Sequence, residues 1–140
     1  MNDPEFDLPP KAAPEVVAAW NDLADRVCRE LVRAGLPARR GDLGAGPQAG
    51  PGAEVHVDPL ADGGVYVDWE TGAELRTTAI DLFAKGIDYA DPPPAVRHYN
   101  KVQKLMQGAL LGILASAGFQ VDKPDPHTYG SAVYVKDLRP

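Results

Sequence analysis

A chain of 140 residues is long enough to bury one hydrophobic core, and it needs no disulfide or metal ion to hold that core together. Its single cysteine excludes an intramolecular disulfide and fits a reducing compartment, while a formal net charge of −6 argues against general binding to nucleic acid. The start of the sequence lacks the basic and apolar regions of a secretory signal, and no apolar run approaches the length of a membrane span. These features predict a cytoplasmic protein whose partners are neither nucleic acid nor membrane.

The first half of the chain divides into a tail, a helix and a loop. Residues 1–13 are acidic and rich in proline, with too few apolar side chains to offset the entropy of ordering, so we expect a flexible tail. The remaining residues, 14–140, form the predicted single domain. Pro14 suits the first position of a helix, and apolar residues recur after it at helical spacing as far as Gly35. Glycine and proline dominate residues 41–52, which predicts a mobile loop.

The segment 54–70 predicts a β-hairpin with two different faces. Alternation along both strands directs apolar side chains to one side, which we expect to be the sheet core. This apolar face carries Val55, Val57, Val65, Val67 and Trp69. The opposite, polar face carries Glu54, His56, Asp58, Tyr66, Asp68 and Glu70.

Two helices and two short strands complete the prediction. Thr71, with Glu74 three residues later, has the spacing of a capping box and begins a helix that ends near Gly86. The expected buried stripe of this helix is Leu75, Ala79, Leu82 and Phe83. A longer helix is predicted over residues 94–117, closed by Gly118. Residues 119–121 and 132–136 are predicted strands.

Two parts of the sequence resemble each other, 33–38 with 116–121 and 52–60 with 130–138. Both have the order helix, Ala-Gly turn, short strand, loop and strand, which is compatible with an internal duplication or with unrelated helices that end in glycine beside Val-x-Val strands. Either interpretation predicts a weak strand at residues 36–38. The element order is then α-β-β-β-α-α-β-β. It predicts an α+β two-layer sandwich, with one antiparallel sheet of four or five strands and three helices on one face.

The polar face of the hairpin is the first candidate site. Cross-strand neighbours there could converge on a divalent ion, as in a small metal-dependent enzyme or ligand-binding protein, with His56, Asp58, Asp68 and Glu70 as ligands. The wet face of any one-sided sheet also carries carboxylates. An intermediate hypothesis is a surface for a cationic partner, because crowded carboxylates repel one another. We favour this hypothesis over a metal site and predict no cofactor. Its candidate residues are Glu54, Asp58, Tyr66, Asp68 and Glu70.

The second candidate surface lies on the helix at 94–117. Arg97, Lys101 and Lys104 line one side of its first turns, but from Gly108 onward small and apolar residues replace charge on all sides. We expect this half to be buried on both sides, by the same chain or by a second subunit. The partner-surface candidates are Gly108, Leu111 and Gly112. The basic side chains suit a solvated helix face, or could meet the acidic hairpin face of a neighbouring copy.

The sequence contains only incomplete matches to the patterns that are typical of catalysis. Cys28 lies on or beside the apolar side of the first helix, where cysteine behaves as a small hydrophobe. Asp125, His127 and Ser131 are the residue types of a hydrolase triad, but they share one turn-rich loop without a nucleophile elbow or an oxyanion loop. The glycine-rich segment 41–52 lacks the lysine and hydroxyl residue of a phosphate-binding loop. We therefore lean toward a protein without enzymatic activity.

The order of a helix, three strands, a helix and two more strands is similar to the type III secretion chaperone-like fold, whose members bind protein segments and often dimerise. The resemblance is one of topology and spans most of the chain. The long helix at 94–117 and the lack of a final helix depart from it. The hairpin at 63–69 resembles that of small uncharacterised proteins without an assigned function. The acidic strand face, the apolar end of the long helix and the lack of catalytic groups favour a non-enzymatic protein-binding module. Such a module would be a chaperone, an adaptor or an immunity-type inhibitor, and its partner another protein or a second copy of the chain.

Overall fold

The computed structural model describes residues 10–41, 50–88, 90–123 and 132–138. The predicted tail at 1–9, most of the predicted loop (42–49) and the cluster of Asp125, His127 and Ser131 lie outside these residues. Within them, the helices and strands follow the predicted order, which confirms the α+β class. They are α1 (Pro14–Arg33), β1 (Ala38–Arg40), β2 (Gly52–Asp58), β3 (Gly64–Glu70), α2 (Ala73–Ala84), α3 (Pro94–Ser116), β4 (Phe119–Asp122) and β5 (Val133–Leu138).

The strands form one sheet in the order β1-β2-β3-β5-β4. The pairs β2–β3, β3–β5 and β4–β5 are antiparallel, as predicted, but β1 runs parallel to β2, with Ala38 opposite Ala53. The sheet is therefore mixed, which corrects the prediction of a wholly antiparallel sheet. The first strand also lies at 38–40 instead of 36–38. Three residues are too few for an alternation pattern, and the long segment before β2 leaves enough chain for a return to parallel pairing.

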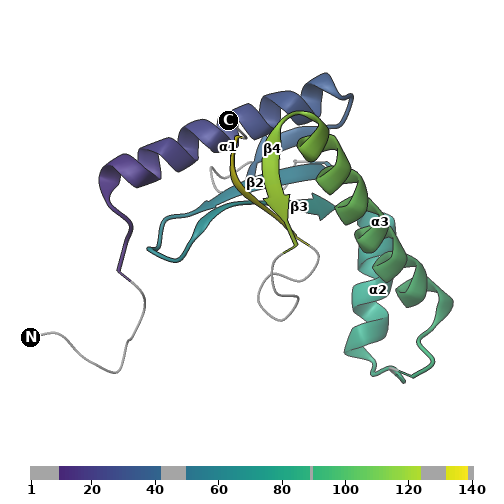
Figure 1. Cartoon of the computed structure of the whole chain (residues 1–140). Coiled ribbons are helices and arrows are strands. Elements are labelled where there is room, and N and C mark those ends of the chain that lie inside the picture. Colours follow the sequence, from purple (N-terminus) through teal and green to yellow (C-terminus); the bar gives the residue numbers. More distant parts are fainter. Residues whose placement is uncertain (1–9, 42–49, 89, 124–131, 139–140) are drawn as a thin grey trace, which may run out of the picture.

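Helices α1 and α3 cover the apolar face of this sheet (Figure 1). Most of the buried side chains of both helices join those of the strands in a single core, and Val96 of α3 is buried outside it. The helices contribute Leu23, Ala24, Val27, Leu31, Leu110 and Leu114, and the strands contribute Ala53, Val55, Val57, Val65, Val67, Phe119, Val133 and Val135. The predicted apolar face of the hairpin is thus confirmed, with Trp69 only partly buried against the core. Each fully buried valine or leucine stabilises the fold by roughly 1.5–3 kcal/mol.

Helix α2 departs from the predicted arrangement because it packs against α3 and adds no side chain to the shared core. Figure 1 shows it beside the first half of α3, away from the strands. Of its expected stripe, Ala79 is buried but Phe83 is 38% exposed, and the neighbouring Ile80 is 50% exposed. Gly72, not Thr71, is the N-cap, and the buried Thr71 hydroxyl has no hydrogen-bond partner among the described residues. A periodic stripe shows that a helix has a packed side, but not whether its neighbour is a sheet or another helix.

Residues 10–13, which we predicted to be part of the flexible tail, are held against the turn between β2 and β3. The backbone N–H of Ala12 donates to the carbonyl of Pro59 at 2.8 Å, and the N–H of Ala61 donates to the carbonyl of Pro10 at 2.7 Å. Lys11 also forms an isolated antiparallel bridge with Leu60. Composition gave no sign of this contact because it is made by backbone groups, which every residue carries.

Candidate functional site

The polar face of the hairpin is organised around His56. The register of β2 and β3 places Glu54 opposite Asp68 and His56 opposite Tyr66. The Nε2 atom of His56 lies 3.6 Å from Oε2 of Glu54 and 3.6 Å from Oδ2 of Asp68, and its ring stacks on that of Tyr66 with 4.9 Å between centroids. Gly41 packs so closely on the imidazole that a Cβ there would come within 2.4 Å of Cε1. The imidazole therefore lies between two carboxylates and is packed against Tyr66 and the backbone of Gly41.

Two carboxylates of this face, Glu54 and Glu70, have cationic partners from other elements. Arg39 of β1 donates a hydrogen bond to Oε1 of Glu54 at 2.8 Å, and Arg76 of α2 forms an ion pair with Glu70. The repulsion expected among the hairpin carboxylates is thus largely offset within the chain. This finding weakens the case for an external cationic partner on the sheet, because the chain itself supplies much of the positive charge.

Asp68 is less well compensated than Glu54 or Glu70. Partial burial raises the pKa of its carboxyl above the ordinary value of 3.8, and although His56 opposes this shift, the negative charges of Glu54 and Glu70 add to it. Its side chain is still 45% exposed. The ionised form of Asp68 is therefore disfavoured in the folded protein, whereas its neighbours Glu54 and Glu70 are paired with arginines.

The four residues named as alternative metal ligands, His56, Asp58, Asp68 and Glu70, do not converge. Asp68 approaches His56, but Glu70 is paired with Arg76, and Asp58 lies at the turn, where Oδ1 accepts a hydrogen bond from the N–H of Leu60 at 3.1 Å. In the part of the chain that the structure describes, no group of three or more His, Cys, Asp and Glu side chains is arranged to hold a metal ion. Spacing along two strands determined the face of each residue but not the direction in which its carboxylate turns.

The second half of α3 presents one open side within the chain, so the same chain covers only one of the two sides that we predicted to be buried. Leu110 and Leu114 are buried, and Leu111 is partly buried against the core. Gly108 and Gly112 are exposed, and a Cβ built on either would meet no atom within 4 Å. Of the three residues predicted to form a partner surface here, the two glycines are accessible and Leu111 belongs mainly to the core.

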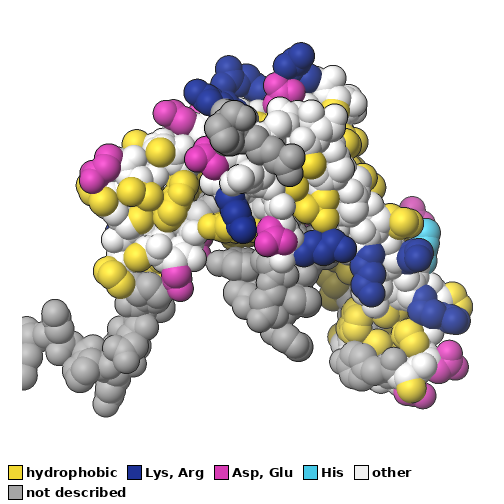
Figure 2. Space-filling view, viewed as in Figure 1, with side chains coloured by type: hydrophobic (Ala, Val, Ile, Leu, Met, Phe, Trp, Pro, Cys, Tyr) yellow, Lys and Arg dark blue, Asp and Glu magenta, His cyan; other side chains and the backbone are white. Residues whose placement is uncertain are grey.

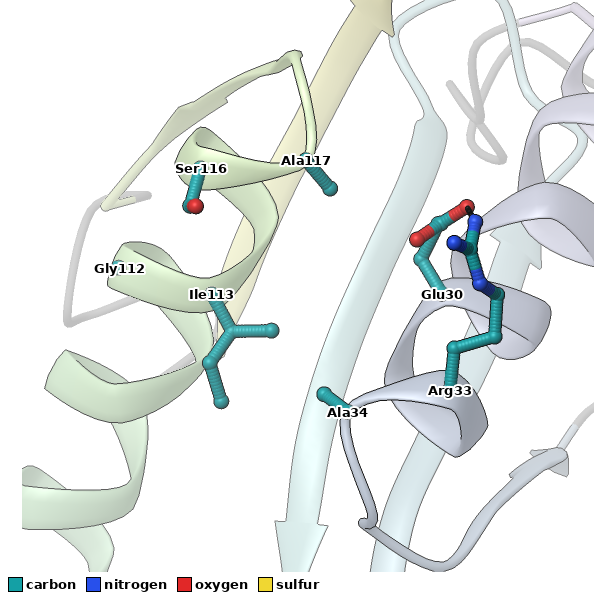
Figure 3. Close-up of a pocket in the computed structure, with 7 residues that line it drawn as sticks. All are labelled: Glu30, Arg33, Ala34, Gly112, Ile113, Ser116 and Ala117. Atoms are coloured by element: carbon teal, nitrogen blue, oxygen red, sulfur yellow. Dashed lines mark hydrogen bonds and ion pairs between the residues drawn. The ribbon is translucent and has the colours of Figure 1, made fainter.

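A groove, not predicted from the sequence, lies between the C-terminal ends of α1 and α3; we call it the α1–α3 groove. Its first hollow, of about 470 Å³, is lined by Glu30, Arg33 and Ala34 on one side and by Gly112, Ile113, Ser116 and Ala117 on the other. Figure 3 shows Ile113 and Ala117 pointing toward the end of α1. A second hollow of about 400 Å³ shares Glu30, Arg33 and Ala117 and adds Arg26, Arg29 and Phe119. The groove exists because small residues occupy both helix ends, so the side chains do not fill the space between them.

The two similar sequence segments meet at this groove. Each helix ends in Ala-Gly, and Gly35 and Gly118 close α1 and α3 with φ of 98° and 100°, a backbone conformation that favours glycine. Ala34 and Ala117, the residues before them, both line the first hollow. The likeness does not extend through the sheet, because β1 is parallel to β2 whereas β4 is antiparallel to β5. The repeated helix ends were therefore the sequence signal that could have pointed to the groove.

Comparisons with models of protein families, with curated proteins and with solved structures gave no match. Among the residues that the structure describes, no helix is both long enough and apolar enough to cross a bilayer. The proposed function consequently rests on the geometry of this chain.

Proposed function

We propose that this protein is a non-enzymatic protein-binding module and that its partner docks in the α1–α3 groove. The observation that carries the proposal is the lining of the groove: small and apolar residues of α3 on one side face charged residues of α1 on the other. An apolar centre with a polar rim is typical of protein interfaces. The hollows are open to solvent, which suits side chains of a docked segment better than an enclosed small molecule.

The hairpin face supports this function less well than the groove does. Arg39 and Arg76 already pair with Glu54 and Glu70, so a cationic partner would have to displace existing ion pairs. Because each exposed ion pair contributes little free energy, exchanging one for another would add little to the affinity of a partner. In the groove, by contrast, docking covers apolar surface that is now in contact with water. A chaperone, an adaptor or an immunity-type inhibitor would each use such a site.

The chain offers a matched pair of variants for testing the groove. Gly108 and Gly112 lie on the exposed side of the same helix, and both have open space for a side chain, but only Gly112 lines the groove. Gly112→Trp should fill the first hollow, while Gly108→Trp adds the same side chain outside it. Wild type and both variants are tagged in the native cell, cross-linked and purified, and the retained proteins are compared by mass spectrometry.

We expect a protein that wild type and Gly108→Trp retain and Gly112→Trp loses. Circular dichroism of the three purified proteins confirms that each is folded. Equal retention by all three proteins would show that the partner does not bind in the groove. Loss with both variants would show that the partner contacts the whole exposed side of α3. Failure of wild type to retain any protein above an untagged control would contradict a protein-binding function.

A further inference from the structure

The wall of the groove formed by α1 carries an uneven distribution of charge. Arg26, Arg29 and Arg33 project from successive turns of α1, and Figure 2 shows basic side chains gathered along the top of the molecule, over this helix. Arg33 is paired with Glu30 at 2.7 Å. Arg26 and Arg29 are exposed and have no ion pair with any described residue. In a chain of net charge −6, two guanidinium groups without a described counter-charge therefore border an apolar floor.

The two hollows differ in what they can accept. The first has a floor of small and apolar residues around Gly112 and Ile113, and both helix ends approach it with partly negative carbonyl groups. The second is lined by the buried Phe119, by Arg26 and Arg29, and by the ion pair of Glu30 with Arg33, so positive charge is in excess there. An apolar side chain is suited to the first hollow and a carboxylate to the second. Arginine binds carboxylates through paired N–H donors, which gives such a contact direction as well as charge.

We infer that the partner docked in the α1–α3 groove is an acidic segment of another protein, in which a large apolar side chain lies close to one or more carboxylates. The inference rests on the proposed protein-binding function and adds the chemistry of the partner. The apolar side chain fills the first hollow beside Gly112, and the carboxylates bind Arg26 and Arg29. A nucleic acid fits less well, because its backbone carries a negative charge at every nucleotide and the protein has a net charge of −6, whereas a peptide can place one or two carboxylates at Arg26 and Arg29 and an apolar side chain beside Glu30.

Random peptides displayed on phage provide a test that does not require the natural partner. They are selected on the full-length wild-type protein, and the enriched sequences are synthesised with a fluorescent label for anisotropy titrations. Arg26→Glu/Arg29→Glu reverses the charge of the groove wall. Arg97→Glu/Lys101→Glu makes the same change in net charge on exposed residues of α3 that do not line either hollow. Gly112→Trp fills the first hollow.

We expect the enriched peptides to combine Asp or Glu with Phe, Leu or Trp. Their affinity should fall by about tenfold or more, equivalent to ~1.4 kcal/mol, with Arg26→Glu/Arg29→Glu, and should be nearly unchanged with Arg97→Glu/Lys101→Glu. It should also fall with Gly112→Trp. Circular dichroism establishes that each variant is folded before its affinity is compared.

The other outcomes separate this inference from the proposed function. Peptides that require an open Gly112 but carry no acidic residues would overturn the inference and leave the protein-binding function standing. Peptides indifferent to Gly112→Trp, or no enrichment at all, would overturn both. A labelled single-stranded DNA that binds through Arg26 and Arg29 more tightly than the peptides would assign the groove to nucleic acid. A synthetic peptide of residues 1–9 is also titrated. If it bound wild type and lost affinity with the same variants, the partner in the groove would be a second copy of this chain instead of another protein.

Discussion

Val67 and Asp68 are neighbours on β3 that occupy opposite faces of the sheet, so they form a matched pair for testing the assignment of faces. Val67 is fully buried, whereas the side chain of Asp68 is 45% exposed. Val67→Ala removes two buried carbons, a loss of about 1.6 kcal/mol at ~0.8 kcal/mol for each. An unrelaxed cavity of roughly 50 Å³ adds about 1.2 kcal/mol at ~24 cal/mol per Å³. We therefore expect the free energy of unfolding to fall by about 1.6 to 2.8 kcal/mol, depending on how far the core relaxes.

Asp68→Ala should change the free energy of unfolding by less than about 0.5 kcal/mol, or increase it. The variant loses the approach to His56 at 3.6 Å, but it also removes a partly buried charge that Glu54 and Glu70 repel. Urea denaturation monitored by circular dichroism measures both changes, and an unaltered slope shows that the shift in midpoint reports stability. If Val67→Ala were neutral, or if Asp68→Ala unfolded the domain, the faces of the hairpin would be assigned wrongly.

Three further predictions concern charge, helix propensity and association. The pKa of Asp68 is higher in the folded chain than in the unfolded chain, so over a range of pH the folded chain binds a proton that the unfolded chain has released. This proton binding contributes its whole stabilisation below about pH 4. The contribution is lost as the pH rises through the pKa of the folded state. Asp68→Asn, which does not ionise, should gain stability relative to wild type over this rise in pH, and a difference that stays constant in urea denaturation across the pH series would contradict the shift. Gly108→Ala and Gly112→Ala should each stabilise α3 by roughly 0.8–1 kcal/mol, since both sites have room for a Cβ, and a lower thermal midpoint for either would show that its site is packed. Leu105 of α3 is 60% exposed, and Ile80 and Phe83 of the adjacent helix α2 are 50% and 38% exposed, so we expect self-association at high concentration that Leu105→Asp weakens; light scattering that finds only monomer in wild type would contradict this expectation.

The features that the sequence predicted correctly depend on short-range patterns. Alternation over 54–70 placed four valines in the core, because side chains two apart on a strand share a face whatever the rest of the fold does. The ends of α1 and α3 were predicted from Gly35 and Gly118, since few other residues adopt positive φ at low cost. Such patterns are local, and tertiary contacts do not alter them.

The features that the sequence did not predict depend on contacts between distant segments. The carboxylates of the hairpin were predicted to repel one another because no lysine or arginine lies within the hairpin itself. Arg39 reaches Glu54 through the pairing of β1 with β2, and Arg76 reaches Glu70 because α2 begins directly after β3. Both partners were present in the sequence, but the Arg39–Glu54 pair depends on the parallel direction of β1, which three residues do not encode, and the Arg76–Glu70 pair depends on where α2 begins.

The small residues of α3 show the same limit, and they also bear on function. Small residues in an apolar helix permit either close packing or open space, and only the position of the neighbouring helix decides between them. At Gly112 the outcome is open space, so glycine costs the helix about 0.8–1 kcal/mol relative to alanine without any steric requirement among the described residues. A cost of this kind is expected where a position is kept small for a bound partner. Gly108 carries the same cost outside the groove. If only substitutions at Gly112 reduce binding, glycine there leaves room for a partner; if substitutions at the two positions have the same effect, the helix is simply rich in glycine.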